Sequence, residues 1–355
     1  MNEQDESYFK SRGAQLNTHN RFLKQQYVTE HIEGLDEPLL ENTATKYFEE
    51  HAKKIVNKPE SPDLPFLYSM NPYQGCEHGC IYCYARNTHQ YWGLSAGLDF
   101  ERKIVVKHNA AQLLEKTFDN PKWKATPILL SGNTDCYQPA ERKFKITRTM
   151  LEVLLKYRNP VSIITKNNLI LRDLDLLTQL NELNLVHVNI TITSLNESLR
   201  QKLEPRTVTG KGRLQTINTL ASNDIPVRVM LAPIIPGLNS AEVPKIIEEA
   251  ANNGASAAES TIVRLNGSIG EIFTDWIYKA FPDKAEKVLH LIADCHRGHL
   301  NDSRWGTRLK GEGKTAEAIH NLFHISVKRF MKDRQMKELN LNVFKRVQKG
   351  QLNLF

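Results

Sequence analysis

From residue 66 onward, short apolar runs typical of β-strands alternate with longer stretches in which apolar residues recur at helical spacing. The helical stretches are Ile146–Tyr157, Leu171–Leu183, Leu214–Ser222 and Val243–Asn252. The β-type runs are Phe66–Met70, Pro127–Leu130, Val161–Thr165, Val186–Thr193, Val227–Ala232 and Ser260–Leu265. This alternation predicts βα units around a parallel sheet. Six units are too few for an eight-fold barrel of about 250 residues, so we predict an α/β fold with a six-stranded partial (β/α)6 TIM-like barrel.

The sequence on either side of this core, residues 66–266, has a different character. Residues 1–65 form a polar N-terminal extension, with a short amphipathic helix expected over residues 41–56. Three prolines between Lys58 and Pro65 indicate a linker, because proline lacks an N–H and restricts the residue before it. Residues 341–355 form a basic tail. Residues 267–340 are predicted to be helical over Glu271–Phe281, Lys284–Asp294 and Ala316–Leu339, with a Gly- and Arg-rich loop before the last helix.

Composition narrows the class of protein. The chain has 355 residues, of which 40% are hydrophobic, enough for a sizeable core. No apolar run is long enough to span a membrane, and the polar, acidic start Met1–Glu6 lacks the features of a signal peptide. Three of the five cysteines are clustered, which does not indicate a disulfide framework. We therefore expect a cytoplasmic protein that does not bind a membrane.

Three cysteines lie together in the stretch Cys76-Glu77-His78-Gly79-Cys80-Ile81-Tyr82-Cys83. Three thiolates at this spacing can hold a [4Fe–4S] cluster and leave one iron open for another ligand. The alternative is a zinc site of Cys3His type that uses His78 or a distant residue. Zinc sites more often show two CxxC pairs, and this chain has no second pair. Only Cys136 and Cys295 remain, too few for a second thiolate-bound cluster.

The CxxxCxxC spacing, with Tyr82 before the last cysteine, resembles the signature of the radical S-adenosylmethionine (radical SAM) superfamily. The flanking residues Asn71–Gly75 and Tyr84–Arg86 resemble the branch related to spore photoproduct lyase, often labelled DNA repair photolyase. The resemblance implies a [4Fe–4S] cluster on Cys76, Cys80 and Cys83, with SAM bound to the open iron. It also implies an electron donor such as flavodoxin or ferredoxin, and cleavage of SAM to a 5′-deoxyadenosyl radical. The same resemblance implies a partial barrel.

Polar residues follow each predicted strand, where βα barrels place their active sites. The resemblance assigns the stretch Ser131–Asp135, with Ser131, Asn133 and Asp135, to the amine of SAM. It assigns Lys166 to the SAM carboxylate, Thr193 and Ser194 to the ribose hydroxyls, and Tyr82 to the adenine. Further strand-end candidates are Pro233–Asn239, Arg264 and Asn266. Ser, Asn, Asp and Gly also form turns and helix caps, so a purely structural interpretation of these positions stays open.

Three other positions carry candidate chemistry. Spore photoproduct lyase uses a cysteine as hydrogen donor, and Cys136, one residue past the expected SAM loop, is a candidate for this role although its offset differs. Arg206 is a candidate for anion binding, with an ordinary surface position as the alternative. Cys295, His296 and His299 have a spacing that metal ligands can use, but no fourth partner is evident, which favours a loop.

The C-terminus carries two further signals. Residues 328–355 contain eight lysines and arginines and two acidic residues, a net charge of +6, which suits either a solvated face or a nucleic-acid contact. The last residues, Gln351-Leu352-Asn353-Leu354-Phe355, resemble the peptide by which bacterial repair proteins bind the sliding clamp. Gln351 would fix the register, while Leu352, Leu354 and Phe355 would fill an apolar groove. The alternative is that this peptide packs on its own core.

These observations lead to ranked hypotheses about function. The first is a radical SAM enzyme that acts on DNA or RNA, in repair or modification. The alternatives are a radical SAM enzyme that modifies a protein or a small metabolite, and a non-catalytic, metal-stabilised protein associated with the sliding clamp. Steep salt dependence of nucleic-acid binding would favour the first hypothesis.

Overall fold

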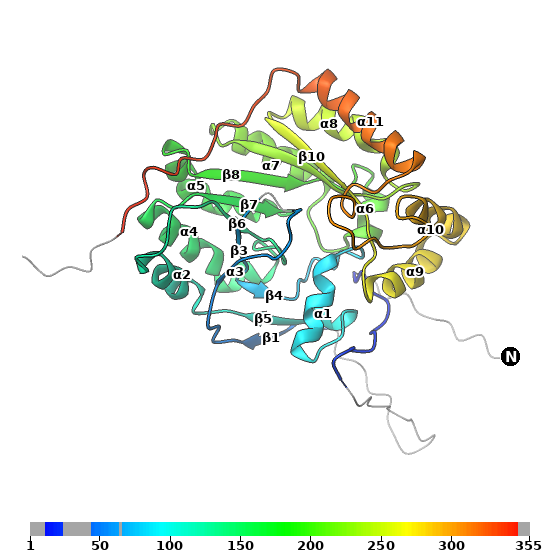
Figure 1. The fold of residues 1–355 in the computed structure, drawn as a ribbon, viewed down its shortest axis with the longest axis horizontal. Coiled ribbons are helices and arrows are strands. Elements are labelled where there is room, and N and C mark those ends of the chain that lie inside the picture. The colour runs from blue at the N-terminus through cyan, green and yellow to red at the C-terminus, as the bar shows by residue number, and fades with distance from the viewer. Residues whose placement is uncertain (1–10, 24–43, 64–65, 347–355) are drawn as a thin grey trace, which may run out of the picture.

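The computed structural model describes residues 11–23, 44–63 and 66–346, and a seven-stranded sheet lies at its centre (Figure 1). The strand order is β10-β9-β8-β7-β6-β3-β2. β2 (Val56–Asn57) pairs antiparallel with β3 at the edge. The other six are parallel to their neighbours: β3 (Tyr68–Met70), β6 (Ile128–Leu130), β7 (Val161–Thr165), β8 (Val186–Thr191), β9 (Val227–Ile234) and β10 (Ala257–Ile262). Six consecutive parallel strands confirm the predicted partial barrel.

The register of the sheet brings the ends of the strands to one edge. Leu130 lies opposite Ile163, Ile163 opposite Val188, and Val188 opposite Val227. The segments that follow β6, β7 and β8 therefore leave the sheet side by side. This carboxyl edge is where parallel βα folds build their sites.

Helices cover the outer side of the sheet (Figure 1). Their apolar sides face inward, and Leu151, Leu177, Ile217 and Ile247 are each 0% exposed. Burial of one such side chain contributes about 1.5–3 kcal/mol relative to exposure, which fixes the helices on the strands. The covering helices are α2 (Ala110–Asp119), α4 (Ile146–Tyr157), α5 (Leu174–Glu182), α7 (Gly210–Ala221), α8 (Val243–Asn252) and α11 (Lys314–Phe330). The 3-10 helix η2 (Asn168–Asp173) precedes α5, so the helix expected from Leu171 begins as a tighter turn.

The N-terminal part forms a second, three-stranded sheet of order β1-β5-β4. Its strands are β1 (Lys46–Glu49), β5 (Lys103–Val106) and β4 (Tyr73–Gln74). The helix predicted over residues 41–56 is wrong for its described part, which contains β1 and begins β2 instead. β1 pairs along its whole length with β5, and β2 pairs with β3. Partner strands distant in sequence overrode the local helical pattern.

The remaining helices lie around the ends of the strands. They are α1 (Leu98–Arg102), α3 (Ala140–Phe144), α6 (Glu197–Leu203), α9 (Ile269–Ala280), α10 (Ala285–Asp294), and the 3-10 helices η1 (Tyr84–Trp92), η3 (Ser240–Glu242) and η4 (Pro282–Lys284). β10 ends at Ile262, before the predicted Leu265, and here the chain begins to pair with the loop between α10 and α11. Ile262 N donates to Leu309 O (3.0 Å) and Leu265 N to Leu300 O (2.8 Å).

The final helix is shorter than predicted, ending at Phe330 instead of Leu339. Beyond it the chain runs across the molecule and finds partners on other elements. Arg334 donates to Ala251 O (2.7 Å) and Ala255 O (2.9 Å), and Asn340 N donates to Asn184 O (2.8 Å). The proposed clamp peptide, residues 351–355, lies outside the described residues. Within the part that the structure describes, no helix is long and apolar enough to cross a membrane.

Candidate active site

The cysteine loop, residues 76–83, joins β4 to η1. Gly79, in the middle of the loop, has a φ of +68°, a left-handed conformation that L side chains rarely adopt. Cys76 and Cys80 are buried, Cys83 is partly exposed, and all three are free thiols. The sequence therefore places three thiols within one tightly turned segment at the carboxyl edge of the barrel.

The donor set of this loop fits an iron–sulfur cluster better than a single ion. Among the described residues, no group of three His, Cys, Asp or Glu side chains is arranged to hold one metal ion. In a cubane each thiolate binds a different iron, so its ligands are spaced more widely than those of zinc. Burial raises the pKa of Cys80 and Cys83, while Lys166 acts in the opposite direction.

The segment 203–207, which begins at the last residue of α6, holds the cysteine loop. Ile81 N donates to Leu203 O (3.0 Å), and Arg206 N donates to His78 O (3.3 Å). Arg206 also pairs with the buried Glu77 at 3.5 Å. These contacts fix the path of the loop between its cysteines. Arg206, a candidate for anion binding, is therefore already engaged with a carboxylate.

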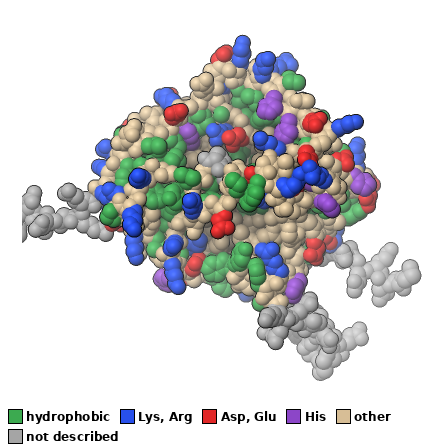
Figure 2. Space-filling view, viewed as in Figure 1, with side chains coloured by type: hydrophobic (Ala, Val, Ile, Leu, Met, Phe, Trp, Pro, Cys, Tyr) green, Lys and Arg blue, Asp and Glu red, His purple; other side chains and the backbone are tan. Residues whose placement is uncertain are grey.

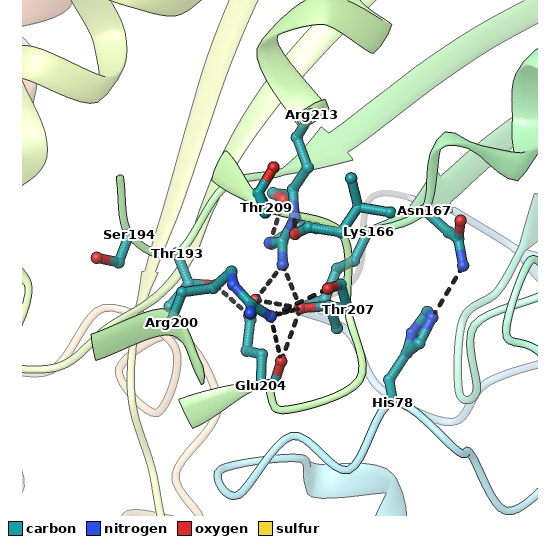
Figure 3. Close-up of polar contacts among 12 residues, drawn as sticks. His78, Lys166, Asn167, Thr193, Ser194, Arg200, Glu204, Thr207, Thr209 and Arg213 are labelled. Atoms are coloured by element: carbon teal, nitrogen blue, oxygen red, sulfur yellow. Dashed lines mark hydrogen bonds and ion pairs between the residues drawn. The ribbon is translucent and has the colours of Figure 1, made fainter. Parts of the chain in front are cut away.

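Glu204 is a fully buried carboxylate at the centre of a hydrogen-bond network (Figure 3). It accepts from the Thr193 hydroxyl (2.6 Å) and from the Tyr82 hydroxyl, and it pairs with Arg213. Burial alone would raise the pKa of Glu204, but the charges of Arg213 and Lys166 together with the donated hydrogen bonds lower it to about 2. The carboxylate therefore stays ionised. It ties Tyr82, the neighbour of Cys83, to the end of β8.

Arg213 on α7 completes this network. Its guanidinium donates to Thr191 O (2.9 Å), Val208 O (2.9 Å) and the Thr207 hydroxyl (2.6 Å). Thr191 is the last residue of β8. The Glu204–Arg213 pair thus joins the cysteine loop, α6, α7 and β8 into one unit.

Thr193 and Ser194, assigned to the ribose of SAM, follow β8 directly, and each donates its hydroxyl proton to a carboxylate. Thr193 donates to Glu204 (2.6 Å) and Ser194 to Glu242 (2.7 Å). A hydroxyl has one proton and two lone pairs, so each can still accept a hydrogen bond from a ribose hydroxyl. The assignment of Thr193 and Ser194 to the ribose stays a prediction, in which their hydroxyl oxygens accept hydrogen bonds from the ribose.

The stretch 131–135 leaves β6 as a hydrogen-bonded turn. Ser131 has a φ of +76°, and its hydroxyl accepts from Cys136 N (2.7 Å). The Asn133 amide nitrogen donates to Gln74 Oε1 (2.8 Å) and Thr88 Oγ1 (3.1 Å). These contacts explain the shape of the turn without a ligand. The assignment of Ser131 and Asn133 to the SAM amine stays a prediction.

Asp135 closes the same turn and links it to the next strand. Its carboxylate accepts from Thr165 Oγ1 (2.8 Å) and Lys166 N (2.9 Å), and it lies 3.3 Å from His78 Nδ1. Burial acts against ionisation, but His78 and the backbone donors lower the pKa of Asp135 overall. The other ring nitrogen of His78 lies 3.3 Å from Asn167 Nδ2 (Figure 3). Asp135 thereby connects the cysteine loop to β7.

The predicted cofactor residues Lys166 and Tyr82 lie together. The Lys166 ammonium is 6.0 Å from the centroid of the Tyr82 ring. This places a positive charge beside the cysteine loop at the end of β7, where it could meet a carboxylate group. The structure therefore gathers Cys76–Cys83, Lys166 and Thr193 at one edge, as the strand-end argument predicts.

The other two cysteines are buried. Cys136 directly follows Asp135, is 0% exposed and belongs to the main hydrophobic core, and its assignment as hydrogen donor stays a prediction. Cys295 is also 0% exposed, and His296 Nε2 lies 2.7 Å from Val263 O. Within the described residues neither histidine of this segment joins a metal-binding group.

Sequence reasoning missed the buried charged pairs that support the cysteine loop. Arg86 and Glu101 are both 0% exposed and ion-paired, and Arg86 donates to Cys80 O (3.0 Å). Glu204 and Arg213 form the second pair. Only the position in the sequence hinted at these pairs. Arg86 lies three residues after Cys83, and Glu204 lies two residues before Arg206.

Comparison with known proteins adds independent findings. The model of the Radical SAM superfamily matches residues 70–250. The uncharacterized protein Rv2578c of Mycobacterium tuberculosis is 32% identical over 242 residues, which cover 67% of this chain and 71% of that protein. The uncharacterized protein MJ0683 of Methanocaldococcus jannaschii is 32% identical over 191 residues, 54% of this chain and 68% of that protein.

Two solved structures share the fold. Spore photoproduct lyase complexed with dinucleoside spore photoproduct aligns with a TM-score of 0.60 at 14% identity, covering 84% of this chain and 85% of that chain. A variant of the same enzyme with bound AdoMet and dinucleoside spore photoproduct gives 0.59 at 15% identity, covering 80% and 78%. At such identities the likeness concerns the fold. The match over residues 70–250 and the relative matched over 71% of its length show that this chain belongs to the radical SAM superfamily, whose enzymes use a [4Fe–4S] cluster and SAM.

Proposed function

We propose that this enzyme binds a [4Fe–4S] cluster through Cys76, Cys80 and Cys83 and acts on nucleic acid. When bound, the cluster and SAM supply a 5′-deoxyadenosyl radical that abstracts a hydrogen atom from the substrate. The chain's own residues hold the cysteine loop in place through Glu204 and Arg86. Lys166 provides the positive charge for the SAM carboxylate at the end of β7.

The observation that carries the choice of nucleic acid is an aromatic and basic surface, the Trp305 rim, formed by Arg264, Trp305 and Arg308. Trp305 is 54% exposed, and the Arg308 guanidinium lies 4.0 Å from the centroid of its ring. Arg264 follows the end of β10. Figure 2 shows basic side chains gathered on this face over the loop between α10 and α11.

The position of the Trp305 rim relates it to the site. Arg308 pairs with Asp63 at 2.6 Å, and Asp63 lies on the segment that leads into β3. β10 and β3 are the first and last of the six parallel strands. The rim therefore spans the open side of the partial barrel, where a large substrate would reach the cysteine loop.

The chemistry of the rim suits a nucleotide. An exposed aromatic ring stacks on a base of any sequence, worth about 1–3 kcal/mol per base, and guanidinium groups bind phosphate through paired hydrogen bonds. Burial and then the nearby Arg308 charge lower the pKa of Arg264, while Asp63 acts in the opposite direction. The fold neighbour spore photoproduct lyase is itself complexed with dinucleoside spore photoproduct.

The basic C-terminal residues 328–355 give weaker support for nucleic-acid binding than their net charge of +6 suggested. Arg334 donates to the carbonyls of Ala251 in α8 and of Ala255, and Arg346 donates to Trp123 O (2.8 Å) and Pro121 O (3.1 Å). Both arginines therefore hold the tail on the protein. Lys328 and Arg329, in the last turn of α11, remain candidates for a phosphate contact.

The test of the proposed function is anaerobic. The protein is reconstituted with iron and sulfide, reduced, and given SAM with single-stranded DNA, duplex DNA or RNA, with Cys80→Ala as control. We expect 5′-deoxyadenosine from the wild type that increases with one nucleic acid and disappears in C80A. Deoxyadenosine formation that no nucleic acid changes would assign the substrate to a protein or small molecule. A zinc-filled, inactive protein would remove the enzyme assignment.

We also propose that Gln351, Leu352, Leu354 and Phe355 bind the bacterial sliding clamp. The support is the sequence pattern alone, since these residues lie outside the described part. A peptide of residues 347–355 should bind the purified clamp by calorimetry, and L354A/F355A should abolish binding. Equal binding of both peptides would reject the proposal without affecting the enzymatic assignment.

A further inference from the structure

The N-terminal strap, residues 12–20, lies against the cysteine loop although more than 50 residues separate the two segments. Its residues are polar and yet buried: Arg12, Gln15, Thr18 and Asn20 are each at most 8% exposed, and Ala14 is 0% exposed. Ala14 belongs to the same hydrophobic cluster as Cys80 and Tyr82. A polar extension without regular secondary structure is rarely buried unless its groups are paired.

One contact shows how closely the strap and the loop approach. A Cβ built on Gly13 would lie 1.7 Å from Gly79 O and 3.3 Å from Arg86 Nη2. No side chain fits at position 13 while the strap is in place. Gly79 is in turn the left-handed residue between Cys76 and Cys80. The two glycines allow backbone to meet backbone beside the cysteines.

The buried Glu101–Arg86 pair joins the strap to the loop. Glu101 accepts from Gly13 N (3.1 Å) and Ala14 N (2.8 Å), and it pairs with Arg86 at 2.5 Å. Arg86 also donates to Cys80 O (3.0 Å). One carboxylate therefore binds the strap, and its arginine partner binds the cysteine loop.

Side-chain amides fasten the rest of the strap. Asn17 Oδ1 accepts from Asp99 N (3.1 Å), and Leu16 O accepts from Leu98 N (3.2 Å). Asn20 donates to Gln90 O (2.8 Å) and Leu94 O (3.0 Å). The strap is thus paired with α1 and with the end of η1, the helix that follows the cysteine loop.

We propose that the N-terminal strap is a cover of the cluster site, which shields Cys80 from solvent and fixes the cysteine loop through Glu101 and Arg86. Gly13 is the positioning residue of this cover. The proposal rests on the cysteine loop as the cluster site and is independent of the substrate class. Its test therefore uses the thiols themselves and does not require an active enzyme.

The test measures alkylation of each cysteine in the metal-free protein by iodoacetamide, with mass spectrometry as readout. Deletion of residues 2–22 should raise the rate at Cys80 roughly tenfold over deletion of residues 2–10. Cys136 and Cys295, each 0% exposed in the core, serve as internal references whose rates should not change. After reconstitution, the longer deletion should also speed anaerobic loss of iron to a chelator.

A point variant keeps the proposal testable if the deletion unfolds the protein, which alkylation of Cys136 would reveal. Gly13→Ala must push the strap away from Gly79 and should raise the Cys80 rate several-fold. The matched control is Gly270→Ala on α9, where the nearest atom to an added Cβ is Leu265 O at 3.3 Å. Rates at Cys80 within twofold of the control in both the deletion and G13A would overturn the proposal.

Discussion

Two buried glutamate–arginine pairs contact the cysteine loop, and each stabilises the fold only while both partners are present. Glu204 and Arg213 are 0% and 1% exposed at the side chain. Removing one partner of such a pair leaves a buried charge unpaired, a loss of about 3–5 kcal/mol. Replacing both partners of such a pair by apolar groups often leaves the free energy of unfolding unchanged. The pairs therefore fix the position of the cysteine loop as much as they stabilise the fold.

Glu204→Gln should therefore lower the free energy of unfolding by about 3–5 kcal/mol, because Arg213 stays buried without its counter-ion. Urea unfolding of the metal-free protein measures this change. The matched control is Glu197→Gln, which removes a carboxylate 42% exposed and paired with Arg200. We expect the control to stay within about 1 kcal/mol of the wild type. A loss below that value in E204Q would contradict the buried-pair argument.

His89 gives a prediction about pH. Its ring is 1% exposed and packs edge-on against Phe100 at 5.6 Å, and burial lowers its pKa to about 4. Since the unfolded chain binds the proton near pH 6.5, stability is full above that pH and falls as the pH drops towards 4. Between pH 7.5 and 4.5 we expect the contribution of His89 to the free energy of unfolding to fall by about 2–3 kcal/mol.

Urea unfolding of the wild type and His89→Phe at the two pH values isolates this contribution. The phenylalanine variant keeps an aromatic ring beside Phe100 and cannot titrate. Its free energy of unfolding should change by about 2–3 kcal/mol less between the two pH values than that of the wild type. Parallel pH dependence in both proteins would show that His89 is protonated in the folded state as readily as in the unfolded chain.

Single residues also show what the sequence could and could not predict. Cys76, Cys80 and Cys83 could be predicted because their spacing is local, and Lys166 because a lysine at the end of this strand matches the family resemblance. Glu101 and Arg86 have no such signal: their roles depend on a strap that arrives from residue 12. The assignment of Asp135 to the SAM amine stays a prediction, whereas the hydrogen bonds that its carboxylate accepts from Thr165 and Lys166 N are revealed only by the folded register.

At the scale of elements, the loop after β9 positions the end of β8. Asn239 is 3% exposed, and its side chain accepts from Ile235 N (2.6 Å) and donates to Thr193 O (2.8 Å). The sequence singled out Pro233–Asn239 as a strand-end segment without assigning this bridge. Through Asn239, the loop after β9 fixes the backbone carbonyl of Thr193, whose hydroxyl donates to Glu204.

Asn239→Ala should lower the free energy of unfolding by about 2–3 kcal/mol, since it leaves a buried N–H and a buried carbonyl unpaired. It should also weaken SAM binding in the reconstituted protein, measured by calorimetry, because Thr193 loses its anchor. The control Asn223→Ala removes an exposed amide that bonds only Thr219 O within α7 and should change stability by about 0.5 kcal/mol or less. Equal effects in both variants would contradict the bridging role.

The elements that were mispredicted share one physical cause. The segment 41–56 has helical spacing, but Lys46–Glu49 pairs with β5. The final helix was expected to reach Leu339, but beyond Phe330 the backbone and Arg334 find acceptors on α8 and elsewhere. In both places a distant partner, invisible in a local window, decided the structure. A strand buried on both faces, such as Ile128–Leu130, was predicted correctly because its apolar run is itself the signal.

At the scale of the whole molecule, six parallel strands and the short antiparallel edge strand β2 leave a barrel that is open between β10 and β2. The Arg308–Asp63 pair spans this gap, and Trp305 and Arg264 line it. A partial barrel thus combines a rigid edge, which holds the cysteine loop, with an accessible side for a large substrate. The sequence predicted the rigid edge from strand pattern. It could not predict the rim, because the rim joins residues 63, 264 and 308.

If the Trp305 rim binds nucleic acid, its aromatic and charged residues should affect binding in different ways. Trp305→Ala should weaken binding of a labelled single-stranded oligonucleotide roughly tenfold while leaving the salt dependence unchanged, because stacking releases no counterions. Arg264→Ala should weaken binding and lower the slope of log K against log salt by about 1, the signature of one lost phosphate contact.

Fluorescence anisotropy across a salt series measures both quantities on the same protein preparation. The control is Tyr278→Ala, an aromatic side chain 43% exposed on α9 that bonds Glu286, and it should change neither affinity nor slope. Because the two rim variants differ in slope, a general loss of folding cannot imitate the result. If Y278A weakens binding as much as W305A, nucleic acid binds elsewhere. If the wild type does not bind while deoxyadenosine still forms, the open side of the barrel admits a different class of substrate.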